Sequence, residues 1–339
     1  MKRHNWIILL LSIVFVGLAI LLIAIGSVDI PFADVLDILL GNPSENKAWN
    51  FIIFESRIPL LATTALAGAA LAVSGLLLQT LFSNPLADPS ILGVSTGSSF
   101  GVAVVLLLSG GAISNVFGGY IAILGGALIG ALVVMAILLV FSASVKSSTM
   151  LLILGVLLSY LTSSGISLMN FFATQEGVHS FVIWGLGNFS GVTMKQLPLF
   201  AILVFVGLVA SIFMVKPLNA LLLGSRYAEN LGINLRRVRN ALLLIAGLLT
   251  AIVTAFCGPI GFIGLVVPHM ARLLLRTSDH YRLMPVTMLS GAVVAMLCTL
   301  ISVLPQENGL IPINAITPII GVPVIIYIIL NRRKIFYFN

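Results

Sequence analysis

The chain has 339 residues, of which 60% are hydrophobic and only 8% are charged, and its mean hydropathy is +1.19. Soluble domains carry roughly 25% charged residues and need a polar shell around their core. The composition therefore excludes a soluble globular protein and predicts an integral membrane protein. The two cysteines, Cys257 and Cys298, are far apart in sequence and suggest neither a disulfide framework nor a metal site.

Apolar runs of the length that crosses a bilayer as a helix, about 20 residues, recur along the whole chain. The alternating pattern of a membrane β-barrel is absent, so we expect an all-α polytopic protein, because helices satisfy their own backbone inside lipid. The first run is longer than the about 7–15 apolar residues of a signal peptide and is interpreted as a retained helix. Ten spans are predicted, at Trp6–Ile25, Ile58–Leu81, Ile91–Leu108, Val116–Phe141, Met150–Phe172, Leu197–Val215, Val238–Phe256, Ile260–Leu275, Met284–Leu304 and Ile316–Leu330.

The basic residues predict the orientation. In a ten-span arrangement one side receives only Lys47, Arg57 and Lys195. The other side receives Lys2, Arg3, Lys146, Lys216, Arg226, Arg236, Arg237, Arg239, Arg272, Arg276, Arg282, Arg332, Arg333 and Lys334. Because cytoplasmic loops of membrane proteins carry an excess of Lys and Arg, both termini are expected in the cytoplasm. The net charge of +7 then reflects topology and gives no reason to invoke nucleic acid.

Two connecting segments are longer than the rest. On the outer side, Ser27 to Ser56 contains IPFADVLDILL, which predicts a short amphipathic helix at the membrane surface. On the inner side, the segment from Lys216 to Asn240 is punctuated by Gly224 and Gly232 and predicts two short helices with glycine breaks. Such helices either dock on a partner or merely tether two spans.

The fifth span carries a polar stripe. Ser159, Ser163, Ser167, Asn170 and Thr174 recur every three or four residues and so share one helix face. Serine hydroxyls in a helix can bond their own backbone carbonyls instead of facing a pathway. An asparagine amide is harder to satisfy in this way, so we expect a face that lines a translocation pathway.

Glycine and proline indicate how the spans pack. Small residues at every fourth position, Gly93, Gly97 and Gly101 on one span and Ala122, Gly126 and Gly130 on the next, favour close helix packing. Interrupted segments occur in both halves: Asn84-Pro85 with Pro89, and Gly258-Pro259-Ile260-Gly261 with Pro268. Paired interruptions of this kind are typical of transporters with internal repeats.

Several chemistries have no motif here. No lysine follows a glycine, so a P-loop is missing and the chain is not expected to hydrolyse ATP by that route. The histidines lack the H-E-x-x-H spacing, and no acidic pair sits inside a predicted span, which disfavours a metalloprotease and a proton-coupled carrier. A secondary transporter that works without an ATPase stays open as the alternative.

Four stretches carry a family resemblance: GAALAVSGLLLQTLFSNPLADPSILGVSTGSSFG (Gly68–Gly101), LNALLLGSRYAENLGIN (Leu218–Asn234), GPIGFIGLVVPHMARLL (Gly258–Leu274) and SDHYRLMP (Ser278–Pro285). They resemble the FecCD-type permeases, the membrane subunits of ABC importers for ferric siderophores, haem and cobalamin. The resemblance implies the type II importer permease fold, one transmembrane domain over residues 1–339, with spans two to five and seven to ten as inverted repeats. It also implies a homodimer in the cell (inner) membrane, two ATPase subunits, a periplasmic or lipid-anchored substrate-binding protein, no cofactor and no catalytic role for this chain.

The resemblance assigns a cytoplasmic gate to two turns. The residues that match those narrowing the inner exit in the family are Asn84, Pro85 and Leu86, together with Ser147, Ser148 and Thr149. An ordinary helix-connecting turn, with Asp88 solvated or capping the next helix, is the alternative. On the family pattern the pathway lies between two copies, where the stripe of Ser159, Ser163, Ser167 and Asn170 would line it.

The segment Lys216 to Asn240 matches the helices that couple the family's permeases to their ATPases. The matching residues are Leu218, Asn219, Gly224, Arg226, Glu229 and Gly232, whereas Ser225 and Tyr227 depart from the usual acid and small residue. On the outer side, Arg57 matches an arginine that pairs with the binding protein, while Leu60 and Val303 stand where further basic residues are usual. Arg57 is thus the single clear docking candidate, and anchoring at the membrane interface is its alternative role. The motifs leave the cargo open among siderophore, haem and cobalamin.

Overall fold

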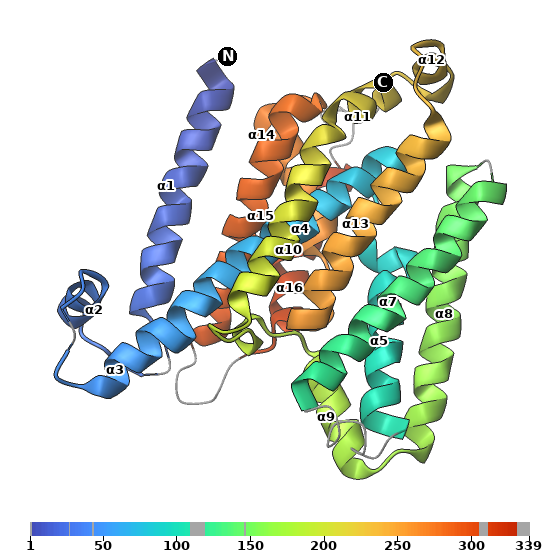
Figure 1. Cartoon of the computed structure of the whole chain (residues 1–339). Helices are drawn as coiled ribbons and strands as arrows, with labels where there is room; N and C mark the ends of the chain where they lie inside the picture. Colours follow the sequence, from blue (N-terminus) through green and yellow to red (C-terminus); the bar gives the residue numbers. More distant parts are fainter. Residues whose placement is uncertain are drawn as a thin grey trace.

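Long helices run side by side through most of the protein (Figure 1). The structure is a computed structural model that describes residues 2–26, 28–42, 44–108, 119–145, 147–304 and 311–330. Three parts of the predictions of orientation and of the fourth span lie outside the described residues: Lys146, Val116–Gly118 and Arg332–Lys334.

Each of the ten predicted spans falls on a helix, in the predicted order. They are α1 (Lys2–Ala24), α4 (Ile58–Leu81), α5 (Val94–Ala103) continued by a π-helical turn (Val104–Leu108), α7 (Gly119–Ser144), α8 (Ser148–Phe172), α10 (Leu197–Phe213), α13 (Leu235–Cys257), α14 (Ile263–Leu275), α15 (His280–Val303) and α16 (Ile313–Leu330). Among the described residues, six helices are long and apolar enough to cross a membrane, or seven when the bent pair of α10 and α11 (Val215–Leu222) counts as one span. Three shorter apolar helices, Val94–Leu108, Ile263–Leu275 and Ile313–Tyr327, complete the set. The all-α polytopic architecture is therefore confirmed.

Two of the helix starts that differ from prediction have local reasons. α15 begins at His280, four residues early, because the Asp279 carboxylate accepts a hydrogen bond from the Tyr281 backbone N–H at 3.1 Å and caps the helix. α14 begins late, at Ile263, because the chain before it is held out of helix by a Gly258 φ of 76° and a Phe262 φ of 69°.

The core is built around α4. Nearly all of its side chains from Ala67 to Leu81 are buried, and it packs on α15, α13, α14 and α10. Such burial of an apolar helix on all sides is what a uniformly hydrophobic sequence predicts for the centre of a bundle.

The helix contacts repeat between the two halves of the chain. α5 packs on α7 and α8, as α14 packs on α15 and α16; α4 packs on α15 and α14, as α13 packs on α7 and α5. In Figure 1, α4 and α13 run in opposite directions. This pattern is that of the predicted inverted repeat of spans two to five and seven to ten.

The predicted glycine ridges are in contact, and their role in packing is confirmed. A Cβ built on Gly101 would collide with the Gly126 carbonyl, and one on Gly97 would lie 2.7 Å from the Gly130 carbonyl oxygen. Small residues thus bring α5 and α7 to backbone contact, as expected for helices inside lipid.

The two ends of the bundle carry different short helices. At one end lie α11, α12 (Ser225–Asn230) and the start of α1; at the other lie α2 (Phe32–Leu39), α3 (Lys47–Ile52) and α9 (Gln175–Gly185) (Figure 1). We refer to them as the α12 end and the α2 end. The predicted amphipathic helix is α2, which buries Val35 and Ile38 against Ile30 and Ile53.

Candidate functional site

The residues assigned to a gate form a tight turn after α4. The Asn84 side-chain oxygen accepts from the Leu86 N–H at 2.9 Å, and the Asn84 carbonyl accepts from the Ala87 N–H at 3.1 Å. This arrangement is an Asx turn, which Asn-Pro sequences favour. We call Asn84–Asp88 the gate turn. Leu86 is the residue that it presents outward, with 43% of its surface exposed.

Asp88 ends the gate turn and is buried, so the solvated position that sequence reasoning allowed is wrong. Its carboxylate accepts a hydrogen bond from the Ser90 hydroxyl and lies beside Gly264 of α14. Removal from water disfavours the charged form, and burial accordingly raises the pKa of the Asp88 carboxyl.

Two side chains of α14 form hydrogen bonds in this region, His269 with the gate turn itself and Arg272 with the last turn of α4 before it. The His269 ring nitrogen Nε2 lies 2.6 Å from the Pro85 carbonyl oxygen, and the Arg272 guanidinium donates to the Gln79 side-chain oxygen at 2.6 Å. The Gln79 amide in turn donates to the Leu265 carbonyl at 3.1 Å. Both residues belong to the quoted PHMARLL motif, but sequence reasoning gave them no role. Two strongly polar residues in an apolar span were the signal that could have found them.

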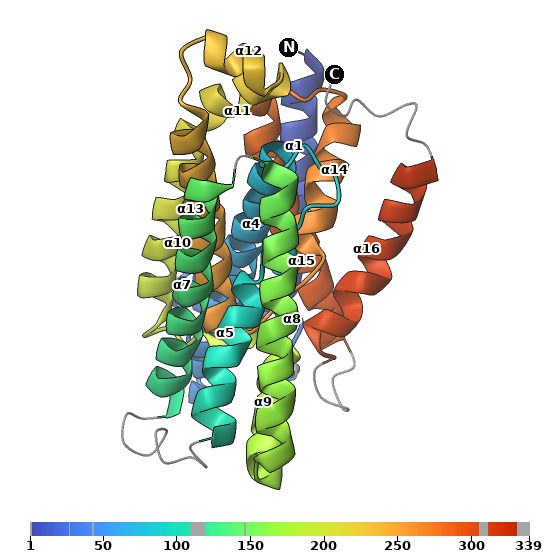
Figure 2. The same ribbon diagram turned by 90° about the vertical axis from the view of Figure 1, so that its right-hand side faces the viewer.

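The second predicted gate element starts α8. The Ser147 hydroxyl caps the helix by accepting from the Met150 N–H at 3.4 Å, and Ser147 and Thr149 are exposed. Figure 2 shows that α4 ends, and α8 begins, towards the end that carries α11 and α12. A cavity of about 230 Å³ lies between the turn that follows Asp88 and α8, lined by Ser90, Ile91, Val156, Ser159 and Tyr160.

The stripe on α8 is partly satisfied within its own helix. The hydroxyls of Ser159 and Ser167 donate to the carbonyls four residues earlier, at 2.9 and 3.0 Å. The Asn170 side-chain oxygen is buried and finds no hydrogen-bond partner among the described residues. Thr174 lies beyond the end of α8 and caps α9 instead, so its place on the stripe is wrong.

The same stretch of α8 is exposed. Ser163 and Ser167 are open, and so are large apolar side chains on α8, with Tyr160 at 71%, Phe171 at 81% and Phe172 at 73% exposure. No other described helix of this chain covers that face. A helix that combines such aromatics with serines has the character of a surface that meets a partner or a wet pathway.

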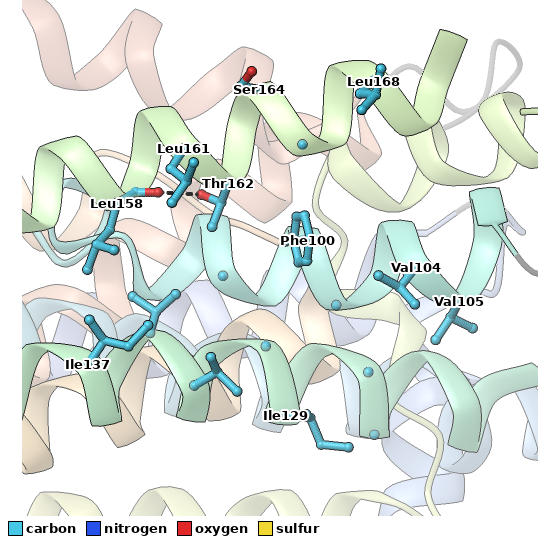
Figure 3. Close-up of a pocket in the computed structure, with 18 of the residues that line it drawn as sticks. Phe100, Val104, Val105, Ile129, Ile137, Leu158, Leu161, Thr162, Ser164 and Leu168 are labelled. Atoms are coloured by element: carbon cyan, nitrogen blue, oxygen red, sulfur yellow. Dashed lines mark hydrogen bonds between the residues drawn. The ribbon is translucent and has the colours of Figure 1, made fainter. Parts of the chain in front are cut away.

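A large cavity beside α8 is lined mainly by apolar residues. It measures about 1050 Å³ and lies between α5, α7 and α8, with Phe100, Ile129, Ile137 and Leu161 among its walls (Figure 3). The Thr162 hydroxyl at its edge donates to the carbonyl of Leu158 at 2.9 Å. No charged residue is among those that line it.

The predicted pair of short helices is confirmed as α11 and α12. Gly224 and Gly232 adopt φ values of 96° and 82°, which only glycine reaches without strain, and they end the two helices. Arg226 and Glu229 are exposed. Large apolar residues beside them are exposed as well: Leu223 at 59%, Tyr227 at 60% and Leu231 at 59%. Leu218 and Asn219 instead face the bundle, where Leu218 is fully buried.

Arg57 lies at the α2 end but points inward. It is 4% exposed, and its guanidinium donates to the carbonyls of Ile23 at 2.6 Å, Ala24 at 2.9 Å and Val28 at 2.5 Å. The first two carbonyls belong to the last residues of α1 and the third to the segment that follows it, so the side chain fastens the end of α1 to the start of α4. Neither of the two roles predicted for Arg57, docking and anchoring at the membrane interface, included this contact. Docking through Arg57 stays a prediction.

Among the described residues, no group of His, Cys, Asp and Glu could hold a metal ion. Cys257 and Cys298 are buried free thiols.

Known proteins share this arrangement. The model of the FecCD transport family matches residues 8–331. The vitamin B12 import system permease proteins of Citrobacter koseri and Escherichia coli are each 36% identical over 282 residues, covering 83% of this chain and 84% of theirs. A solved structure of a metal-chelate type ABC transporter in an inward-facing conformation superposes with a TM-score of 0.83 at 28% identity, covering 97% of this chain and 99% of that one. The chain is thus a multi-pass membrane permease of the ABC importer class, and it belongs to the FecCD transport family.

Proposed function

We propose that the protein imports a large chelate, either cobalamin, haem or a ferric siderophore, through the cell membrane as a homodimer driven by a separate ATPase. The observation that carries the proposal is the protruding pair α11 and α12, whose exposed Leu223, Tyr227 and Leu231 have no partner helix among the described residues. Exposed apolar side chains mixed with charges are typical of a protein contact. The relatives that import vitamin B12 make cobalamin the first cargo to test.

The proposal places α11 and α12 in the cytoplasm together with both termini. The described basic residues support this, because Arg226, Arg236, Arg237, Arg276 and Arg282 lie on or beside the short helices and helix ends of the α12 end. The carboxylates of α2, Asp34 and Asp37, lie at the opposite end. The α2 end would then receive the substrate-binding protein.

The gate turn and the start of α8 would face their copies across the dimer axis. Support comes from the exposed face of α8 and from the exposed Leu86, which together leave the α12 end of a single chain open on one side.

Reconstitution tests the proposal. The permease is purified with the ATPase and the binding protein of its importer and placed in liposomes, and uptake of cyanocobalamin, haemin and a ferric siderophore is measured with ATP inside. We expect uptake of one of them, and loss of uptake when the P-loop lysine of the ATPase is replaced. Uptake that persists without the ATPase and follows an ion gradient would identify a secondary carrier.

A mutation pair locates the coupling surface. Replacing Arg226 and Glu229 together by alanine should leave membrane insertion intact, because both are exposed outside the spans, but weaken ATPase binding and uptake by about tenfold. The matched control replaces the exposed Glu176 and Lys195 near the α2 end, where no effect on ATPase binding is expected. Equal behaviour of the two double variants would remove α12 from the coupling surface.

A further inference from the structure

Two histidines of the family-like motifs are buried between α11 and the gate turn. His269 and His280 are each 1% exposed. His269 holds the Pro85 carbonyl of the gate turn, as described above. His280, the first residue of α15, lies between α11 on one side and the last turn of α4 on the other. Neither residue has a place in the gate or the coupling surface as the family pattern assigns them.

The first link joins α11 to His280. The Asn219 side-chain oxygen accepts from the His280 backbone N–H at 2.8 Å and lies 2.8 Å from His280 Nδ1. The Asn219 amide nitrogen donates to the Asp279 carboxylate at 2.7 Å. These partners fix the amide orientation, because a backbone N–H only donates and a carboxylate only accepts. His280 Nδ1 must then carry the proton that Asn219 accepts.

The second link joins His280 to α4. The His280 Nε2 atom lies 2.9 Å from the Thr80 hydroxyl oxygen. In a neutral ring whose proton is on Nδ1, Nε2 is an acceptor. The Thr80 hydroxyl also lies 3.0 Å from the Leu76 carbonyl oxygen of its own helix, so its one proton is shared between that carbonyl and His280 Nε2. Thr80 is 2% exposed, so this bond is shielded from water, which would otherwise offer both groups replacement partners.

Thr80 belongs to the last turn of α4, whose backbone carbonyls bond the start of the gate turn. The Ser83 N–H bonds the Thr80 carbonyl at 3.2 Å, and the Asn84 N–H bonds the Gln79 carbonyl at 3.1 Å. A shift of Thr80 along or around the axis of α4 therefore carries the gate turn with it. At the other end of these links, α11 is bent by 48° from α10 and packs on both α4 and α15. A partner that pushes α11 therefore applies force to the contact of α11 with α4 and α15.

We propose that Asn219, His280 and Thr80 are positioning residues that pass movement of α11 to the gate turn. The inference rests on the proposed function, in which an ATPase docks on α11 and α12. Hydrogen bonds that are part-buried at Asn219 and buried between His280 and Thr80 connect the two sites over three side chains from three helices. Each bond has a directional donor and acceptor. Apolar packing alone would let α11 slide over α4 without turning it, since dispersion contacts have no fixed direction.

The test needs no cargo. A fluorescent probe is attached to a Leu86→Cys variant, which is selective because Cys257 and Cys298 are buried. The permease is assembled with its ATPase, and the probe signal is recorded with and without ATP. We expect an ATP-dependent change in the otherwise native chain and a change at least about 5-fold smaller in Thr80→Val, which keeps the shape but removes the hydroxyl. ATP hydrolysis should persist in that variant.

Two variants separate transmission from stability. Thr64→Val is the matched control, because Thr64 is also buried on α4 and its hydroxyl meets that of Thr299 at 3.4 Å, away from the gate; it should keep the full probe response. Thr80→Ser restores the hydroxyl and should restore the response. Adding Asn219→Ala to Thr80→Val should reduce the response no further, because both changes break one chain.

The outcomes separate the two proposals. An ATPase that neither binds nor hydrolyses ATP with the native permease overturns the proposed function. Two results would overturn the role of Asn219, His280 and Thr80 while the ATPase still binds and hydrolyses ATP. One is a probe response in Thr80→Val equal to that in Thr64→Val. The other is a probe signal that does not change with ATP in the otherwise native chain.

Discussion

Arg57 matches a docking residue in sequence, but its buried side chain makes a structural contact inside the protein. Its guanidinium donates to two carbonyls at the end of α1 and to that of Val28 just beyond it, a spread that the planar fork of N–H donors reaches and the compact ammonium of lysine does not. The carbonyls at a helix C-terminus lack intrahelical partners and favour a cation. The side chain therefore joins α1 to the start of α4.

Arg57→Lys should lower the free energy of unfolding by about 2 kcal/mol, because two or more charged hydrogen bonds are lost from a buried site. Thermal unfolding in detergent measures this, with Arg226→Lys on the exposed α12 as the control, expected within about 0.5 kcal/mol. Equal stability of Arg57→Lys and native protein would contradict the fastening role. A docking role would show separately, as slower association of the binding protein whose slowing disappears at high salt.

The helices cross at glycines where their backbones touch. A Cβ on Gly75 of α4 would collide with the backbone of Gly264 of α14, and a Cβ on Gly68 with the Gly291 backbone of α15. Because backbone atoms cannot swing aside as a side chain does, any larger residue must separate the helices. α14 also carries His269 and Arg272, so this spacing sets the position of the gate turn.

Gly75→Ala should cost about 1–3 kcal/mol of stability through overpacking and should reduce transport, because α14 moves off α4. Gly125→Ala is the matched control, since a Cβ there meets nothing within 4 Å and alanine favours the helix. Thermal unfolding and uptake are measured for both variants. Similar stability and uptake in the two variants would mean that the helices can accommodate a methyl group at Gly75.

At the scale of the whole molecule, α8 and the residues around the gate turn form an exposed side of the described chain. The helix surfaces where α5 packs on α7 and where α4 packs on its neighbours are buried, whereas Tyr160, Phe171 and Phe172 of α8 are exposed. A second copy of the chain is the partner proposed for this side.

Cysteines placed at Asn84 or at Thr149 should crosslink between protomers and block transport, because the proposed gate brings each residue close to its copy. The measurement is dimer formation on gels with and without nucleotide, and a cysteine at Glu45 near the α2 end serves as the control that should not crosslink. Failure of both gate positions in every nucleotide state would favour a plain helix-connecting turn.

The sequence by itself determined the class, the order of the spans and the family-like motifs. Hydrophobicity along one helix is a local property, and so are the glycines that end α11 and α12; both are readable without neighbours. Only the tertiary structure decided what each polar residue touches. Arg57 bonds α1 across 34 positions and His280 meets Thr80 across 200, and no local pattern encodes a partner at that distance. In an apolar bundle, a polar side chain bonds whatever donor or acceptor the packing brings near, so its role follows from the fold.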